Sequence, residues 1–77
     1  MNKIRRKQLQ EIIDRIEDLK SDLEALKEEE EEYRDNMPEN LQSSERYELA
    51  DEACNNLNYA FDDLEDAVSY IEEAIEV

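Results

Sequence analysis

Carboxylates are the side chains of this sequence with the greatest capacity for chemistry. The 77 residues include 24 Asp and Glu against nine Lys and Arg, which gives a net charge of −15. Carboxylates bind metal ions, act as general acids or bases, and can stand in for the phosphates of a nucleic acid. The densest run, Glu28–Glu32, consists of glutamates only. Each of these kinds of chemistry requires particular neighbouring residues.

Metal binding and catalysis both lack the residues that they would need. The chain has no His, so the Glu-x-x-His pairs with which helical bundles hold two irons are absent. It has no Gly, and therefore no Gly-rich phosphate loop, and no nucleophile stands at a plausible spacing from a base. We expect no metal, no cofactor and no catalytic residue. We interpret Glu28–Glu32 as a solvated helix surface.

The charge and the single cysteine limit the expected partners and compartment. A charge of −15 repels the phosphates of nucleic acids and of anionic membranes, so a basic protein is the favoured partner. No apolar run is long enough to span a bilayer, and no signal peptide is recognisable. Cys54 has no second cysteine with which to form a disulfide, and we expect it to be a small core residue. These features predict a cytoplasmic protein without direct nucleic-acid or membrane binding.

The elements that position these side chains are predicted by hydrophobic spacing, which is clearest from Tyr47 onward. Apolar residues recur there in alternating steps of three and four, the a and d positions of a heptad repeat. They are Tyr47, Ala50, Cys54, Leu57, Phe61, Leu64, Val68, Ile71 and Ile75. One alanine per heptad follows at position g: Ala53, Ala60, Ala67 and Ala74. The pattern predicts a helix over about residues 44–76 that buries a broad face.

A preceding helix is predicted from about residue 3 to residue 35. Its a and d positions are Leu9, Ile12, Ile16, Leu19, Leu23, Leu26, Glu30, Tyr33 and Met37, and Ile13 widens this seam at one point. Pro38 disfavours a helical conformation at the residue before it, so the helix ends there. A connection over about residues 36–43 leads to Ser43 or Ser44 as the cap of the second helix. The short connection favours one domain, 1–77: an all-α, antiparallel two-helix coiled-coil hairpin.

Matching the two seams predicts a register in which the numbers of paired seam residues add up to 80. Basic side chains at the e positions of the first helix then meet polar or acidic ones at the e positions of the second. The predicted seam pairs include Leu19 with Phe61 and Leu26 with Cys54. At the flanking e positions, where the paired numbers add up to 78, the predicted pairs include Arg6 with Glu72 and Lys27 with Asp51.

The first seven residues hold four of the nine basic side chains: Lys3, Arg5, Arg6 and Lys7. One interpretation is an arm that binds nucleic acid. The other is that the hairpin places this cluster beside the acidic end, at Glu72, Glu73 and Glu76. Coulomb's law favours the second interpretation, because the acidic end otherwise repels itself.

A two-helix hairpin of this length buries little core, so a second copy or another partner is expected. The alanines allow a further helix to approach closely, and a homodimer that forms a four-helix bundle is the economical arrangement. Its predicted interface is Ala53, Ala60, Ala67 and Ala74. An isolated hairpin with one wet face is the alternative.

Two tyrosines off the seam indicate a second surface. Tyr59 and Tyr70 are eleven residues apart, close to three helical turns, and so share a face with several carboxylates. The predicted partner-binding residues are Tyr59, Asp62, Asp63, Asp66, Tyr70 and Glu73. Exposed aromatics are frequent interface anchors. The alternative is that both rings lie along the edge of the dimer.

The segment Asp35–Tyr47, followed by Asp51–Cys54 and the acidic, alanine-rich helix, resembles a family of very small acidic proteins of prophages and other mobile elements in gut Firmicutes. The resemblance covers most of the chain, and the turn segment is its distinctive part. That family has no settled activity, so the resemblance implies no functional residues. It does imply a place in the cytoplasm of a bacterial host.

Two functions from different classes are compatible with these features. One is an inhibitor or decoy that presents carboxylates in place of phosphates to the nucleic-acid groove of a basic host defence protein, such as a restriction or CRISPR nuclease. The other is a structural or adaptor coiled-coil dimer that binds through its seam or its alanines. An enzyme is not expected.

Overall fold

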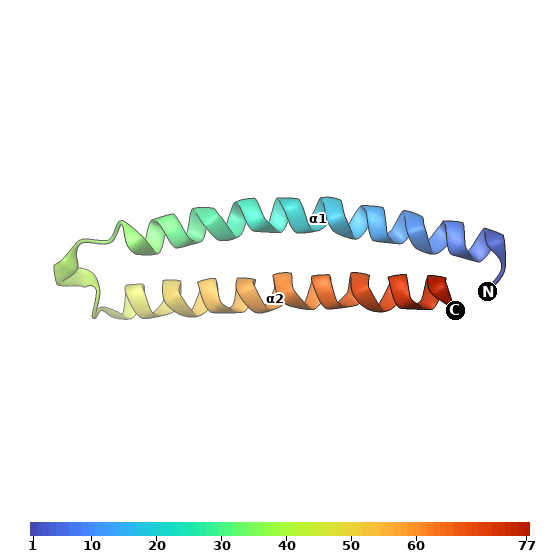
Figure 1. Ribbon diagram of the computed structural model, residues 1–77. Coiled ribbons are helices and arrows are strands. Elements are labelled where there is room, and N and C mark those ends of the chain that lie inside the picture. Colours follow the sequence, from blue (N-terminus) through green and yellow to red (C-terminus); the bar gives the residue numbers. More distant parts are fainter.

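The computed structural model describes residues 1–77 as two long α-helices joined by a short turn (Figure 1). Helix α1 spans Lys3–Asp35, a 3₁₀ turn η1 spans Glu39–Leu41, and helix α2 spans Glu45–Glu76. The helices lie side by side and run in opposite directions, forming a rod 59 Å long (Figure 1). The chain contains no strand. The predicted all-α hairpin is therefore confirmed, whereas its dimerisation into a four-helix bundle stays a prediction.

Each helix begins at a side chain that satisfies one of its free N–H groups. The Oδ1 atom of Asn2 accepts a hydrogen bond from the backbone N–H of Arg5 at 2.7 Å. The Oγ atom of Ser44 accepts one from the backbone N–H of Tyr47 at 3.3 Å. Free N–H groups in the first turn of a helix need such partners, so these two caps fix where α1 and α2 start.

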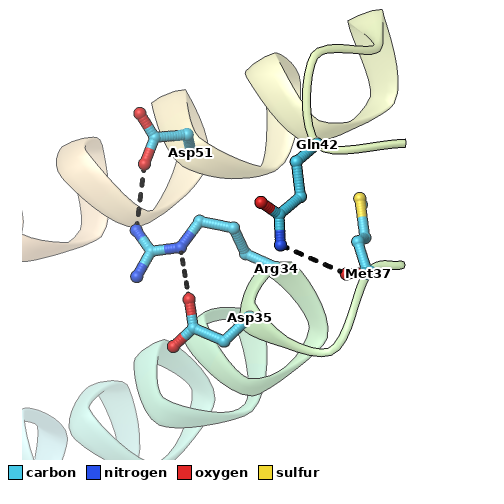
Figure 2. Close-up of polar contacts among 5 residues, drawn as sticks. All are labelled: Arg34, Asp35, Met37, Gln42 and Asp51. Carbon is cyan, nitrogen blue, oxygen red and sulfur yellow. Dashed lines mark hydrogen bonds and ion pairs between the residues drawn. The ribbon is translucent and has the colours of Figure 1, made fainter. Parts of the chain in front are cut away.

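The turn closes the end of the hairpin with Met37 rather than with the turn's own Leu41. Helix α1 ends at Asp35, because Pro38 keeps the residue before it out of the helical region. The side chain of Met37 is buried, and its carbonyl oxygen accepts a hydrogen bond from Nε2 of Gln42 at 3.5 Å (Figure 2). Leu41 is 40% exposed.

The face that α1 turns toward α2 differs from the prediction. It consists of positions a and e instead of a and d. The buried or half-buried row is Leu9, Ile13, Ile16, Lys20, Leu23, Lys27, Glu30, Arg34 and Met37. Two residues assigned to the seam, Leu19 and Leu26, are each 59% exposed. The predicted a/d seam is thus wrong for α1, while every a and d residue of α2 is buried or half-buried.

The use of the e row also displaces the register by about one helical turn. The ammonium nitrogens of Lys20 and Lys27 lie 5.1 and 5.4 Å from the centre of the Phe61 ring. Leu23 lies midway between these lysines in the same buried row, so it shares a layer with Phe61. The predicted pairing of Leu19 with Phe61 is wrong for this reason.

Polar contacts between the two e rows hold this register. Lys20 Nζ lies 3.6 Å from Glu65 Oε1, Lys27 Nζ donates to Asn58 Oδ1 at 3.0 Å, and Arg34 Nη1 donates to Asp51 Oδ1 at 3.0 Å. The predicted pairs Arg6–Glu72 and Lys27–Asp51 do not form. Long basic side chains lay their aliphatic stems across the seam and bring their charged ends to the opposite helix. One flank of the hairpin is closed in this way.

Candidate protein-interaction surfaces

Arg34 is the polar side chain of the closed flank that lies nearest the turn, and it contacts two carboxylates (Figure 2). Its Nε and Nη1 atoms donate hydrogen bonds to Asp35 and Asp51, each at 3.0 Å. The hydrogen bond with Asp35 raises the pKa of the Arg34 guanidinium above its ordinary value. The guanidinium therefore stays charged and joins the last turn of α1 to α2, close to the connection.

Cys54 is the one side chain with no exposed surface at all. Its thiol is free, and burial raises its pKa above the ordinary value. A thiol without solvent contact and with a raised pKa stays protonated, and a protonated thiol is neither a nucleophile nor a metal ligand. No group of three or more Asp, Glu or Cys side chains is arranged to hold a metal ion. Cys54 accordingly acts as a packing residue.

The outer side of α2 carries the predicted partner-binding residues, which we name the acidic face: Tyr59, Asp62, Asp63, Asp66, Tyr70 and Glu73. All six side chains are exposed, with Tyr59 at 65% and Tyr70 at 71%. None of them forms a hydrogen bond or an ion pair within the chain. They are free to bind another molecule, and that role stays a prediction.

A second surface lies on the flank opposite the e rows, which we name the open face: Ile12, Leu19, Leu26 and Tyr33 of α1, and Ala53, Ala60, Ala67 and Ala74 of α2. Because both e rows occupy one flank, the d row of α1 and the g row of α2 lie together on the other. Ile12 is 39% and Tyr33 49% exposed. Ala60 is exposed, and the other three alanines are half-buried. An apolar strip therefore runs along the rod.

The α1 half of the open face was missed by the sequence reasoning, which assigned those residues to the hairpin core. The signal that could have found them is Ile13, the one large apolar residue at an e position of α1. It is 4% exposed, compared with 39% for Ile12 beside it.

A groove at the turn end supports the same placement of the open face. It has a volume of about 420 Å³ and is lined by Glu30, Tyr33, Glu45, Arg46, Leu49 and Ala50. Tyr33 belongs to the d row of α1, and Arg46 begins the g row of α2, so these rows meet across the groove. A neighbouring groove of about 470 Å³, on the turn side, is also lined by Tyr33 and Arg46.

The basic residues are segregated on one helix. Eight of the nine lie in α1, and the exception is Arg46 at the start of α2. Arg6 donates a hydrogen bond to the backbone oxygen of Val77 at 3.3 Å, so the two ends of the chain lie side by side. No ion pair joins the first seven residues to the acidic end, and Lys3, Arg5 and Lys7 remain exposed.

Neither helix combines the length and the apolar composition that crossing a bilayer requires. Three features of the chain bear on its possible roles: the acidic face, the open face and the distribution of charge between the helices. No family model matches this chain, and neither a curated protein nor a solved structure matches it.

Proposed function

We propose that this chain is a non-enzymatic protein-binding module, a small acidic inhibitor that occupies the nucleic-acid groove of a basic host protein. The observation that carries this proposal is the acidic face, whose carboxylates are exposed and unpaired within the chain. Helix α2 contains 11 acidic residues and a single basic one, Arg46. Such a surface attracts a basic groove and repels the nucleic acid that competes for it.

The density of carboxylates indicates how closely this surface can imitate a nucleic acid. Duplex DNA carries one charge per ~1.7 Å of axis, whereas a helix rises ~1.5 Å per residue. The 11 acidic residues of α2 occupy 32 positions, which is about one charge per 4 Å of helix. The exposed carboxylates of α1 lie alongside and raise the density of charge. A second copy would bring it closer still to the charge density of DNA. The imitation is therefore one of sign and length rather than of exact spacing.

Tyr59 and Tyr70 give this surface its anchors. Carboxylates at the rim of an interface mainly accelerate association and exclude wrong partners, while desolvated aromatics supply much of the affinity. Both rings are more than half exposed and lie among the carboxylates. The resemblance of the turn segment to small prophage proteins favours a host defence protein, such as a restriction or CRISPR nuclease, as the target.

The test is competition with DNA. The chain is immobilised, exposed to a bacterial host lysate at low salt, and eluted either with a short DNA duplex or with NaCl. We expect the immobilised chain to capture basic proteins and the DNA duplex to release them. A triple charge reversal, Asp62→Lys, Asp63→Lys and Asp66→Lys, should abolish their capture. Capture that DNA does not displace would refute the decoy.

A matched variant separates the acidic face from net charge alone. Glu11, Asp18 and Glu28 lie on α1, are exposed, and form no ion pair. Changing these three to Lys alters the net charge by the same amount as the reversal on α2. Capture should persist in this variant, and equal loss in both would show that only the overall charge matters.

The open face favours a second candidate function, a structural or adaptor coiled-coil module that joins other proteins by apolar contacts. Such binding survives high salt, because it does not depend on attraction between charges. It should be lost in a variant with Ala60→Glu and Ala67→Glu and retained in the charge-reversed variants. Under either function we propose that the module is a homodimer in which Ala53, Ala60, Ala67 and Ala74 lie at the interface.

A further inference from the structure

We propose that a second copy of this chain covers the open face with both turns at the same end of the assembly, so that each α1 packs on the α2 of the other copy. This deepens the homodimer included in the proposed function and rests on it. The alanines alone define no orientation. The d row of α1 supplies the larger part of the contact, and the alanines supply the room for it.

The hairpin by itself leaves this row without a partner. Only five of the 77 residues are buried, and Ile12, Leu19, Leu26 and Tyr33 are 39–59% exposed. They recur at every seventh residue, so they form one straight line along the rod. An apolar line of this length, flanked by polar residues, is the kind of patch that marks an interface. The small core of a two-helix hairpin adds to the need for cover.

The observed register places one large and one small residue at each level of the open face. Since Leu23 shares a layer with Phe61, Leu26 lies within about two residues, or ~3 Å, of the level of Ala60. The same step repeats every heptad. The four levels are Ile12 with Ala74, Leu19 with Ala67, Leu26 with Ala60, and Tyr33 with Ala53.

Packing across the interface decides between two orientations. If the two-fold axis runs parallel to the helices, every large residue of one copy faces an alanine of the other. If the axis runs perpendicular to them, large residues face large ones and alanines face alanines. Alternation of large and small side chains fills the space between layers evenly, so the parallel axis is favoured.

Charge favours the same orientation. Helix α1 has eight basic and 12 acidic residues, whereas α2 has one basic and 11 acidic residues. Their formal charges are therefore −4 and −10. With the axis parallel to the helices, each α2 lies against the less acidic α1 of the other copy. The perpendicular axis would place the two most acidic helices against each other, which costs more Coulomb energy.

The first measurement is the mass of the free chain by sedimentation equilibrium at moderate salt. A species of twice 9.2 kDa is expected, and a monomer at all concentrations would overturn the proposal. No host protein takes part, so a failed self-association is distinguishable from a failed decoy.

Substitution then identifies the face. The double variant Leu19→Glu and Leu26→Glu should weaken dimerisation by about 100-fold or more, because it buries charge at the centre of the interface. The matched control is Tyr59→Glu and Tyr70→Glu, which adds the same charge outside the open face. Equal weakening by both pairs would overturn the proposal.

Circular dichroism at matched concentration shows whether the Leu19 and Leu26 variant stays helical. If it unfolds, Leu19→Gln and Leu26→Gln takes its place, with the same expected direction.

Spin labels test the orientation in the unmodified interface. A label on Asn40→Cys in a Cys54→Ala background marks the turn, far from the open-face residues that make the contact. Turns at one end give a short distance between the two labels. The perpendicular axis would separate them by most of the 59 Å length of the rod, and that result would overturn the orientation. A label on Ser21→Cys, near the middle of α1, gives a short distance in either case and controls for labelling.

Discussion

Phe61 lies between two lysines whose ammonium nitrogens are 5.1 and 5.4 Å from the centre of its ring. Lys20 and Lys27 are counted as polar in any binary pattern, yet each is half-buried in the face that α1 turns toward α2. Arg34 continues the row and bonds Asp51. These three are also the only cations that form ion pairs, so the hairpin is fastened along one flank by the basic e residues that the sequence analysis placed beside the seam.

The contribution of Arg34 can be measured with Arg34→Lys. Lysine keeps the charge but loses the fork that reaches Asp35 and Asp51 together. We expect the free energy of unfolding in urea to fall by roughly 0.5–1 kcal/mol, since partly exposed pairs are weak. Arg15→Lys is the matched control, because Arg15 forms no ion pair, and it should change stability by less than about 0.5 kcal/mol. Equal effects would argue against a role for the fork.

Cys54 predicts a dependence of stability on alkaline pH. Burial raises the pKa of its thiol above the ordinary value of 9.0, so the unfolded chain releases this proton at a lower pH than the folded one. The contribution of the protonated, buried thiol to the free energy of unfolding is therefore fully present below pH 9.0 and is lost as the pH rises beyond it. Urea denaturation at about pH 8 and pH 9.5 should show this loss in the native chain and a smaller one in Cys54→Ala. An equal loss of unfolding free energy between these two pH values in both proteins would contradict the prediction.

At the scale of elements, much of the hairpin follows from the sequence. Apolar steps of three and four predict two helices, Pro38 predicts the end of the first, and Ser44 caps the second. The α1 face was predicted wrongly, because the d row offers larger apolar residues than the e row and Ile13 is the one contrary signal. The e row instead places the lysine ammonium groups against Phe61 and brings them to Glu65 and Asn58 of α2, contacts that a pattern of apolar residues does not contain. The positions of the acidic face and the alanines on α2 did follow from the heptad pattern.

Two adjacent isoleucines distinguish the observed seam from the predicted one. Ile13→Ala removes a side chain that is 4% exposed and should cost about 2–4 kcal/mol of unfolding free energy. Ile12→Ala removes one that is 39% exposed and should cost less than about 1 kcal/mol. Both are measured in the Leu19→Glu and Leu26→Glu background, where a second copy does not bury Ile12. A larger loss of unfolding free energy in Ile12→Ala than in Ile13→Ala would support the predicted a/d seam instead.

On the scale of the whole molecule, charge and apolar surface oppose each other. A net charge of −15 on a rod of 59 Å resists the approach of another copy, while the open face favours it. The same charge attracts a basic protein. Salt screens both the repulsion between two copies and the attraction to a basic protein, with a Debye length of about 10 Å at 0.1 M. Added salt therefore favours self-association and disfavours the binding of a basic protein.

Raising NaCl from about 0.05 to 0.5 M should therefore strengthen self-association and weaken the capture of basic proteins. Sedimentation measures the first, and elution from the immobilised chain measures the second. The variant with Glu11, Asp18 and Glu28 changed to Lys carries less negative charge, so its self-association should respond less to salt. If self-association weakened as salt was added, attraction between charges would be its cause, and the apolar interface would be refuted.

The segregation of basic residues also has a consequence for degradation. Trypsin cuts after Lys and Arg, and no such residue follows Arg46 in the chain. Limited digestion should therefore destroy α1 at a rate set by how often the rod opens, and leave residues 47–77 as one intact peptide. Ser69→Arg, on an exposed position of α2, would introduce a cut there and serve as the control. Mass spectrometry of the surviving peptide would then report the opening of the hairpin from one helix alone.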